Sequence, residues 1–253
     1  MSFEGLELSI LGPAFIAGLL ILATHVPLGQ EVLKRGIIFI DLAIAQIAGL
    51  GVIAAYRFGW ETHGWEVQLA AVSSALIAAV GLGWLEKHYQ PIQEALIGVT
   101  FVLAATASIL LLADNPHGSE SLKDLLVGQI LWITWEQLLP TALVTSFILL
   151  IWSNFRERLN HLGFYVLFAL AITSSVQLIG VYLVFASLII PALGSAGHRK
   201  ALLTGYVIGG LGYGLGLIVS SLLDLPSGAV IVWSIAIVAL WFQFAIKSDH
   251  QID

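Results

Sequence analysis

GFYVLFALAITSSVQLIGVYLVFASLIIPALGS, residues 163–195, contains no charged side chain. A helix needs about 20 apolar residues to cross the hydrocarbon of a bilayer. Runs of this kind recur along the whole chain, in which 58% of the 253 residues are hydrophobic and only 10% are charged. A soluble domain of this length carries about 25% charged residues. The composition therefore predicts an all-α, polytopic transmembrane protein and excludes a soluble globular one.

Apolar runs separated by charged or turn-forming residues predict about eight or nine spanning helices within a single transmembrane domain, residues 1–253. Gly180 is the one breaker between the sixth and seventh runs, so one long tilted helix and a broken pair both fit the pattern. The runs are residues 10–28, 36–58, 67–85, 95–113, 137–153, 163–179, 181–195, 202–223 and 228–246.

Lysine and arginine positions predict the orientation, because cytoplasmic loops of membrane proteins carry an excess of both residues. If the N-terminus is outside, eight of the ten Lys and Arg residues fall on the inner side, and only Arg57 and Lys123 fall outside. We therefore expect the N-terminus outside, the C-terminus in the cytoplasm, and an outer loop at about residues 114–136.

The sequence contains none of the local motifs of an ATPase or of a resident metal site. No lysine follows a glycine, so the P-loop pattern is missing and the chain is not expected to hydrolyse ATP by that route. The chain has no cysteine, and its seven histidines show no HxxxH or HExxH spacing. We expect no catalytic residue and no resident cofactor.

Polar residues at membrane depth form a candidate hydrophilic path, because placing an ionisable group there costs about 3 kcal/mol or more. Asp41 is expected about a turn and a half into its span. Two simpler explanations stay open: His25 and Asp41 could be satisfied by backbone and headgroups, and the hydroxyl and amide groups could hold helices together. The candidates are His25, Asp41, Gln46, Thr173, Ser174 and Gln177.

The segment LIIPALGSAGHRKALLT, residues 188–204, combines small and basic residues after an apolar run that Pro191 is expected to end. This composition favours a short helix at the cytoplasmic face that docks onto another protein. An ordinary basic loop that obeys the positive-inside rule is the alternative. The candidate coupling residues are Pro191, Ser195, Gly197, His198, Arg199 and Lys200.

Glycines in the run 202–223 are spaced to let a neighbouring helix approach closely. That neighbour could belong to the same chain or to another subunit. The glycines are Gly205, Gly209, Gly210, Gly212, Gly214 and Gly216.

Several stretches, spread over most of the chain, resemble the integral-membrane subunits of the zinc/manganese/iron ABC importer family. The most specific pieces are the IIPA and DLPSG turns. The stretches are IFIDLAIAQIAGLG at 38–51, QEALIGVTFVLAATASILLL at 93–112, LIGVYLVFASLIIPALGSA at 178–196 and LLDLPSGAVIV at 222–232.

This resemblance implies a permease fold related to that of the type II importers of vitamin B12 and siderophores. It implies a homodimer, or sometimes a heterodimer, with two cytoplasmic ATPases and an extracytoplasmic metal-binding protein, in a bacterial inner membrane and with no nucleic acid. Residues 188–204 resemble the loop that contacts the ATPase. The implied cargo is a divalent transition metal, with zinc ahead of manganese and iron by family frequency.

The chain departs from the family at the second span, which often reads Gly-Asp-Ala-x-Ser-His. Alignment on Gly51 puts Leu42 at the Asp position, Gln46 at the His position and Asp41 at the glycine. Either Asp41 and His25 substitute as ligands, or the cargo differs, or the path binds metal only weakly. The missing ligands leave two rival functions open: a metal-chelate or siderophore permease, and a proton-coupled secondary metal transporter that uses Asp41 and His25.

Overall fold

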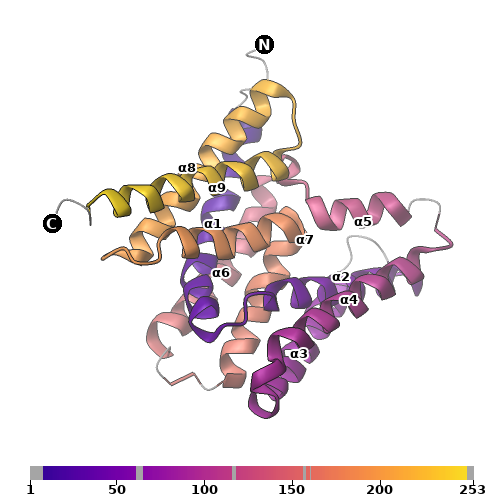
Figure 1. Cartoon of the computed structure of the whole chain (residues 1–253). Coiled ribbons are helices and arrows are strands. Elements are labelled where there is room, and N and C mark those ends of the chain that lie inside the picture. The colour runs from indigo at the N-terminus through magenta and orange to yellow at the C-terminus, as the bar shows by residue number, and fades with distance from the viewer. Residues whose placement is uncertain (1–7, 61–64, 116–117, 156–157, 160, 250–253) are drawn as a thin grey trace.

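The computed structural model describes residues 8–60, 65–115, 118–155, 158–159 and 161–249, and within these ranges it contains helices and no strand (Figure 1). The helices are α1 (Leu8–Arg35), α2 (Ile40–Arg57), α3 (Trp65–His88), η2 (Gln90–Ile92), α4 (Gln93–Leu112), α5 (Gly118–Val127), η3 (Ile130–Trp132), α6 (Trp135–Phe155), α7 (His161–Gly194), α8 (Ala201–Leu223) and α9 (Ser227–Asp249). Every α-helix except α5 is long and apolar enough to cross a membrane, which makes eight in the described part. The prediction of an all-α polytopic membrane protein is confirmed.

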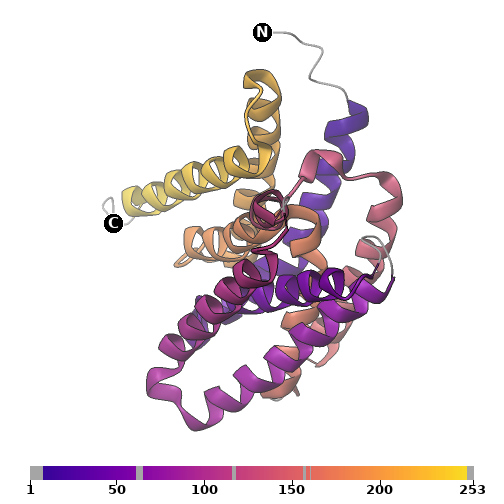
Figure 2. The ribbon, with the colours of Figure 1, turned by 90° about the vertical axis from the view of Figure 1, so that its right-hand side faces the viewer.

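Helix α7 lies at the centre of the bundle. In its most apolar stretch 67% of the residues are buried, whereas in α4 only 17% are. It contacts α3 on one side and α9 on the other. Figures 1 and 2 show α3 and α4 on one side of α7 and α8 and α9 on the opposite side. The outer helices therefore present apolar surface to lipid or to another subunit.

Gly180 bends α7 and decides between the two predicted alternatives. Its φ of 76° and ψ of 165° are not helical, so one continuous run of helix contains a kink. The first half of α7 begins beside the end of α3, where Tyr165 packs near Gly83, and the second half ends beside Ala239 of α9. Gly180 itself lies against Gly128, just after α5. The two halves of α7 therefore lead from this junction to different parts of the bundle. The sixth and seventh predicted runs are therefore the two halves of α7, joined by the kink at Gly180.

The glycines of α8 pack helices of this chain together. Two of them face α1 and two face α9, and at each an added Cβ would lie within 3 Å of an atom of the neighbouring helix. The intramolecular alternative is therefore confirmed for these four positions. The neighbouring pairs are Gly205–Val26, Gly209–Leu22, Gly212–Ile235 and Gly216–Ile231.

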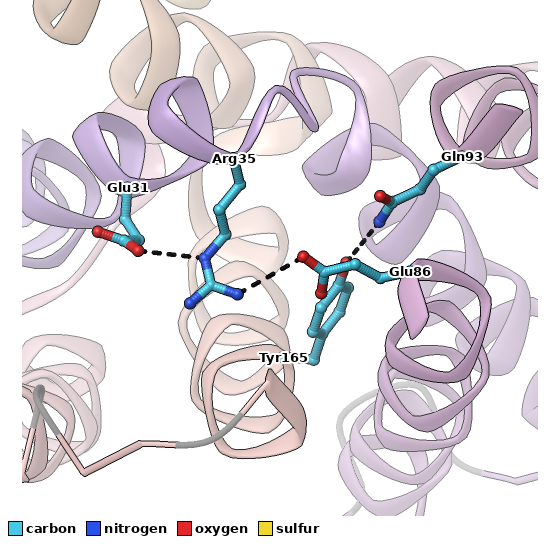
Figure 3. Close-up of polar contacts among 5 residues, drawn as sticks. All are labelled: Glu31, Arg35, Glu86, Gln93 and Tyr165. Carbon is cyan, nitrogen blue, oxygen red and sulfur yellow. Dashed lines mark hydrogen bonds and ion pairs between the residues drawn. The ribbon is translucent and has the colours of Figure 1, made fainter. Parts of the chain in front are cut away.

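A polar network joins the ends of four helices, as Figure 3 shows. The Arg35 guanidinium lies 3.1 Å from a Glu31 oxygen on its own helix and 3.8 Å from an oxygen of Glu86 on α3. The Gln93 amide donates a hydrogen bond of 2.8 Å to the Tyr165 hydroxyl, which connects α4 to α7. Glu86 and Gln93 are both buried. Because the Arg35 guanidinium also lies 4.1 Å from the centre of the Phe164 ring of α7, these contacts hold α1, α3, α4 and α7 at one level of the bundle.

Candidate functional site

An apolar cavity of about 600 Å³ lies among α2, α4, α5, α7 and α9. The polar side-chain groups in its lining are the Gln46 amide, the Tyr182 hydroxyl and the Trp233 indole. Tyr182 and Trp233 are 55% and 72% exposed, so the cavity opens at the surface of the bundle. The lining is Leu42, Gln46, Phe101, Ala105, Ile109, Leu122, Leu126, Val181, Tyr182, Phe185, Ala186, Ile190, Ala229, Val232 and Trp233.

The face of α2 that borders this cavity carries the two positions at which the sequence departs from the family. Leu42 and Gln46 are four residues apart, so they lie on one side of the helix, and both line the cavity. A carboxylate and an imidazole at these positions would both face the cavity. This chain places a hydrocarbon and an amide there, and the Gln46 Oε1 has no hydrogen-bond partner among the described residues.

Asp41 lies beside this face but is turned into the protein, with 1% of its surface exposed. Helix α2 begins at Ile40, so Asp41 is in its first turn, and the expectation of a turn and a half was wrong. The helix starts four residues later than the apolar pattern because Gly36, with φ of 70°, and the following turn interrupt it. No side chain in the described part of the chain makes a hydrogen bond to either carboxylate oxygen. Glu94 lies close enough to interact with Asp41 electrostatically.

His25 is fully buried in α1, and its Nδ1 lies 3.1 Å from the Thr24 hydroxyl. Its Nε2 has no partner among the described residues, so no hydrogen bond joins it to Asp41. On α7, Thr173 is buried, Ser174 donates to the Ala171 carbonyl at 3.0 Å, and Gln177 is exposed. None of these side chains lines the cavity, and Gln46 is the one predicted path residue that does.

Residues 188–204 form the end of α7, a turn and the start of α8, so the predicted separate short helix was wrong. Pro191 does not end the helix, which continues to Gly194. A proline lacks only the amide donor to the preceding turn, and its own carbonyl can still accept a hydrogen bond. The Ser195 amide donates to that carbonyl at 3.0 Å. The chain then reverses at Gly197, whose φ is 86°.

The candidate coupling residues divide by exposure. Pro191 and Ser195 are buried and shape the turn, and the His198 ring is partly covered. Gly197, Arg199 and Lys200 are exposed. Leu202 and Leu203, which the sequence interpretation did not single out, are also exposed beside the basic pair. A surface of exposed basic and apolar residues can dock a protein partner.

Comparisons with known proteins agree with this architecture. The chain is 24% identical over 269 residues to the "Manganese transport system membrane protein MntC" of Listeria monocytogenes, which covers 96% of this chain and 94% of the relative. The solved structure "PsaBC from Streptococcus pneumoniae in complex with Fab" has a TM-score of 0.74 and 21% identity, and the match covers 94% of both chains.

A second solved structure, "An inward-facing conformation of a putative metal-chelate type ABC transporter", has a TM-score of 0.64 and 17% identity over 93% of this chain and 85% of that one. These likenesses confirm the type II importer fold. The sequence model of the ABC 3 transport family matches residues 7–164 and 153–246. The chain therefore belongs to the ABC 3 transport family, the membrane permease subunits of metal ABC transporters, in which a separate subunit hydrolyses ATP.

Proposed function

We propose that this chain is the permease of an ABC importer that moves a divalent transition metal across a bacterial inner membrane. The observation that carries the proposal is the cavity bordered by Leu42 and Gln46, since it lies on the face of α2 where the family places its metal-guiding residues. The whole chain, residues 1–253, acts as one permease domain. Membership in an ABC family leaves the proton-coupled alternative without support.

The cavity is one half of the translocation path. It opens at the surface of the bundle beside Tyr182 and Trp233, where a second copy of the permease would close it. We infer a homodimer with the path between the two copies. The path binds metal weakly, because a hydrocarbon and an amide replace a carboxylate and an imidazole, and weak binding allows release. An extracytoplasmic binding protein would supply the affinity for metal.

The cargo that suits this lining best is Mn²⁺. Family frequency alone predicted zinc, but an amide oxygen such as that of Gln46 is a carbonyl-type ligand, which suits manganese better than zinc. The L. monocytogenes relative described above is named for manganese transport. Zinc uptake at a lower rate is the expected result of a direct comparison.

Residues 188–204 form the coupling segment onto which an ATPase docks. With the N-terminus outside and the C-terminus in the cytoplasm, the exposed pair Arg199 and Lys200 faces the ATPase. Gly197 lies at the tip of this segment, and a Cβ added to it would meet no atom within 4 Å.

The test is co-purification from the native membrane, followed by measurement of metal-stimulated ATP hydrolysis. We expect an ATPase to co-purify and to be lost with Arg199→Glu. Lys123→Glu, a charge reversal at an exposed lysine of α5, is the matched control and should retain it. A permease that purifies without an ATPase and still moves metal under a proton gradient would refute the proposal.

A metal-chelate permease is the second candidate, and the lining of the cavity favours it. A volume of about 600 Å³ with mostly apolar walls can hold a small organic ligand. Uptake by the complete transporter should then be inhibited by excess metal-free chelator that still binds the path. If free Mn²⁺ alone competes, the cargo is the ion.

A further inference from the structure

Gln243, in the last part of α9, holds the end of α7. Its side-chain Nε2 donates to the carbonyl oxygens of Leu193, Gly194 and Ala196, at 2.7, 3.1 and 3.2 Å. The last four carbonyls of a helix have no partner within the helix. One amide from a neighbouring helix therefore adds hydrogen bonds at the end of α7, where the Leu193 carbonyl also accepts from the Ala196 amide, immediately before the exposed turn.

Two further contacts join α9 to this turn. Gly194 packs so tightly against α9 that a Cβ added to it would lie 2.7 Å from the Cβ of Ala239. The His198 ring lies 6.1 Å from the ring of Phe242, on the other side of the turn. The C-terminal half of α9 thus contacts the turn at both of its ends, at Gly194 and at His198.

The N-terminal half of α9 forms a wall of the cavity through Ala229, Val232 and Trp233. Gln243 follows Trp233 by ten residues, which is about 15 Å along a helix. No proline interrupts α9 between these positions. Sharp kinks in helices form at prolines and similar breaks, so we expect this uninterrupted helix to transmit a displacement from one end to the other.

We propose that Gln243 is a positioning residue that fastens the coupling segment to α9, so that motion of the segment moves the cavity wall. The inference rests on the proposed function. The second half of α7 also lines the cavity, with Tyr182, Phe185 and Ile190, and it ends at the turn. Gln243 joins these two helices at the end where the ATPase docks, and together they transmit the motion.

The experiment compares two substitutions in the complete transporter, with its ATPase and binding protein, in proteoliposomes supplied with Mn²⁺. Gln243→Met keeps the length of the side chain but has no donor, whereas Gln243→Lys keeps donors for the carbonyls. Gln137→Met is the control, because Gln137 accepts a hydrogen bond at the start of α6 and touches neither the turn nor the cavity. The readouts are Mn²⁺ taken up per ATP hydrolysed and thermal stability.

We expect Gln243→Met to lower uptake per ATP about tenfold, the factor that the loss of one or two net hydrogen bonds supplies. ATP hydrolysis should continue in this variant, and the Gln243→Lys variant should keep the native ratio of Mn²⁺ taken up to ATP hydrolysed. An unchanged ratio would overturn the inference, as would a ratio that falls only in proportion to stability and that Gln243→Lys does not restore. A native transporter that fails to couple uptake to ATP would overturn the proposed function itself, and the inference with it.

Discussion

Gly128 forms a tight backbone junction with the bend of α7, and replacing it with alanine should be costly. Its φ is 70°, in the left-handed region, and its amide donates to the Asp124 carbonyl at 2.8 Å to end α5. A Cβ at this position would collide with the Ile179 carbonyl group and lie 2.5 Å from the Gly180 nitrogen. These are backbone atoms at the bend of α7, so they cannot move aside as a flexible side chain can.

The magnitude follows from two contributions. A residue other than glycine in the left-handed region costs about 1–2 kcal/mol, and overpacking costs about 1–3 kcal/mol. We therefore expect Gly128→Ala to lower the free energy of unfolding by about 3 kcal/mol, which corresponds to a Tm lower by about 6–12 °C for a chain of this size. Thermal unfolding of the purified protein in detergent measures it.

A graded series of glycine variants provides the controls. Gly98→Ala, in α4, meets no atom within 4 Å and should raise Tm slightly, because alanine favours a helix by about 1 kcal/mol. Gly228→Ala would place its Cβ 2.7 Å from the Val127 carbonyl oxygen without a left-handed φ, so it should lie between the two. If Gly128→Ala melts at the same temperature as Gly98→Ala, the junction is not as tight as described.

Three further predictions concern the polar network and the cavity. Arg35→Met should lower the free energy of unfolding by about 2 kcal/mol, because it leaves the buried Glu86 without its ion pair; an unchanged Tm in scanning fluorimetry would contradict this. Leu42→Asp combined with Gln46→His should tighten Mn²⁺ binding at least about tenfold in calorimetry, since both positions line the cavity; no gain would mean that they do not converge. Asp41→Asn should leave Mn²⁺ uptake unchanged, because Asp41 is buried and does not line the cavity, and a loss of uptake would restore Asp41 to the path.

The places of the membrane helices, and their number to within one, could be predicted from the sequence, because each crossing of the hydrocarbon demands its own apolar run. The position of Gly180 between two such runs marked the bend of α7. The angle of the bend could not be predicted, since it depends on the close approach of Gly128, which lies far away in the chain.

The candidate site could be predicted only in part. The register of the family pattern identified Leu42 and Gln46, and both line the cavity. His25, Asp41 and Thr173 do not line this cavity, because the rotation of each helix decides which side chains face it, and packing against neighbours sets that rotation. The contributions of α5 and α9 to the lining had no local signal.

What the sequence by itself determined is the membrane class, the family and the basic turn near Gly197, since each is written in a local run of residues. Only the tertiary structure decided what supports that turn. Gln243 stands in an apolar run with no motif around it, and its role arises because the packing of α9 against the end of α7 brings its amide within reach of three backbone carbonyls. A hydrogen bond between segments 47–50 residues apart is a property of the packing, and no local pattern encodes it.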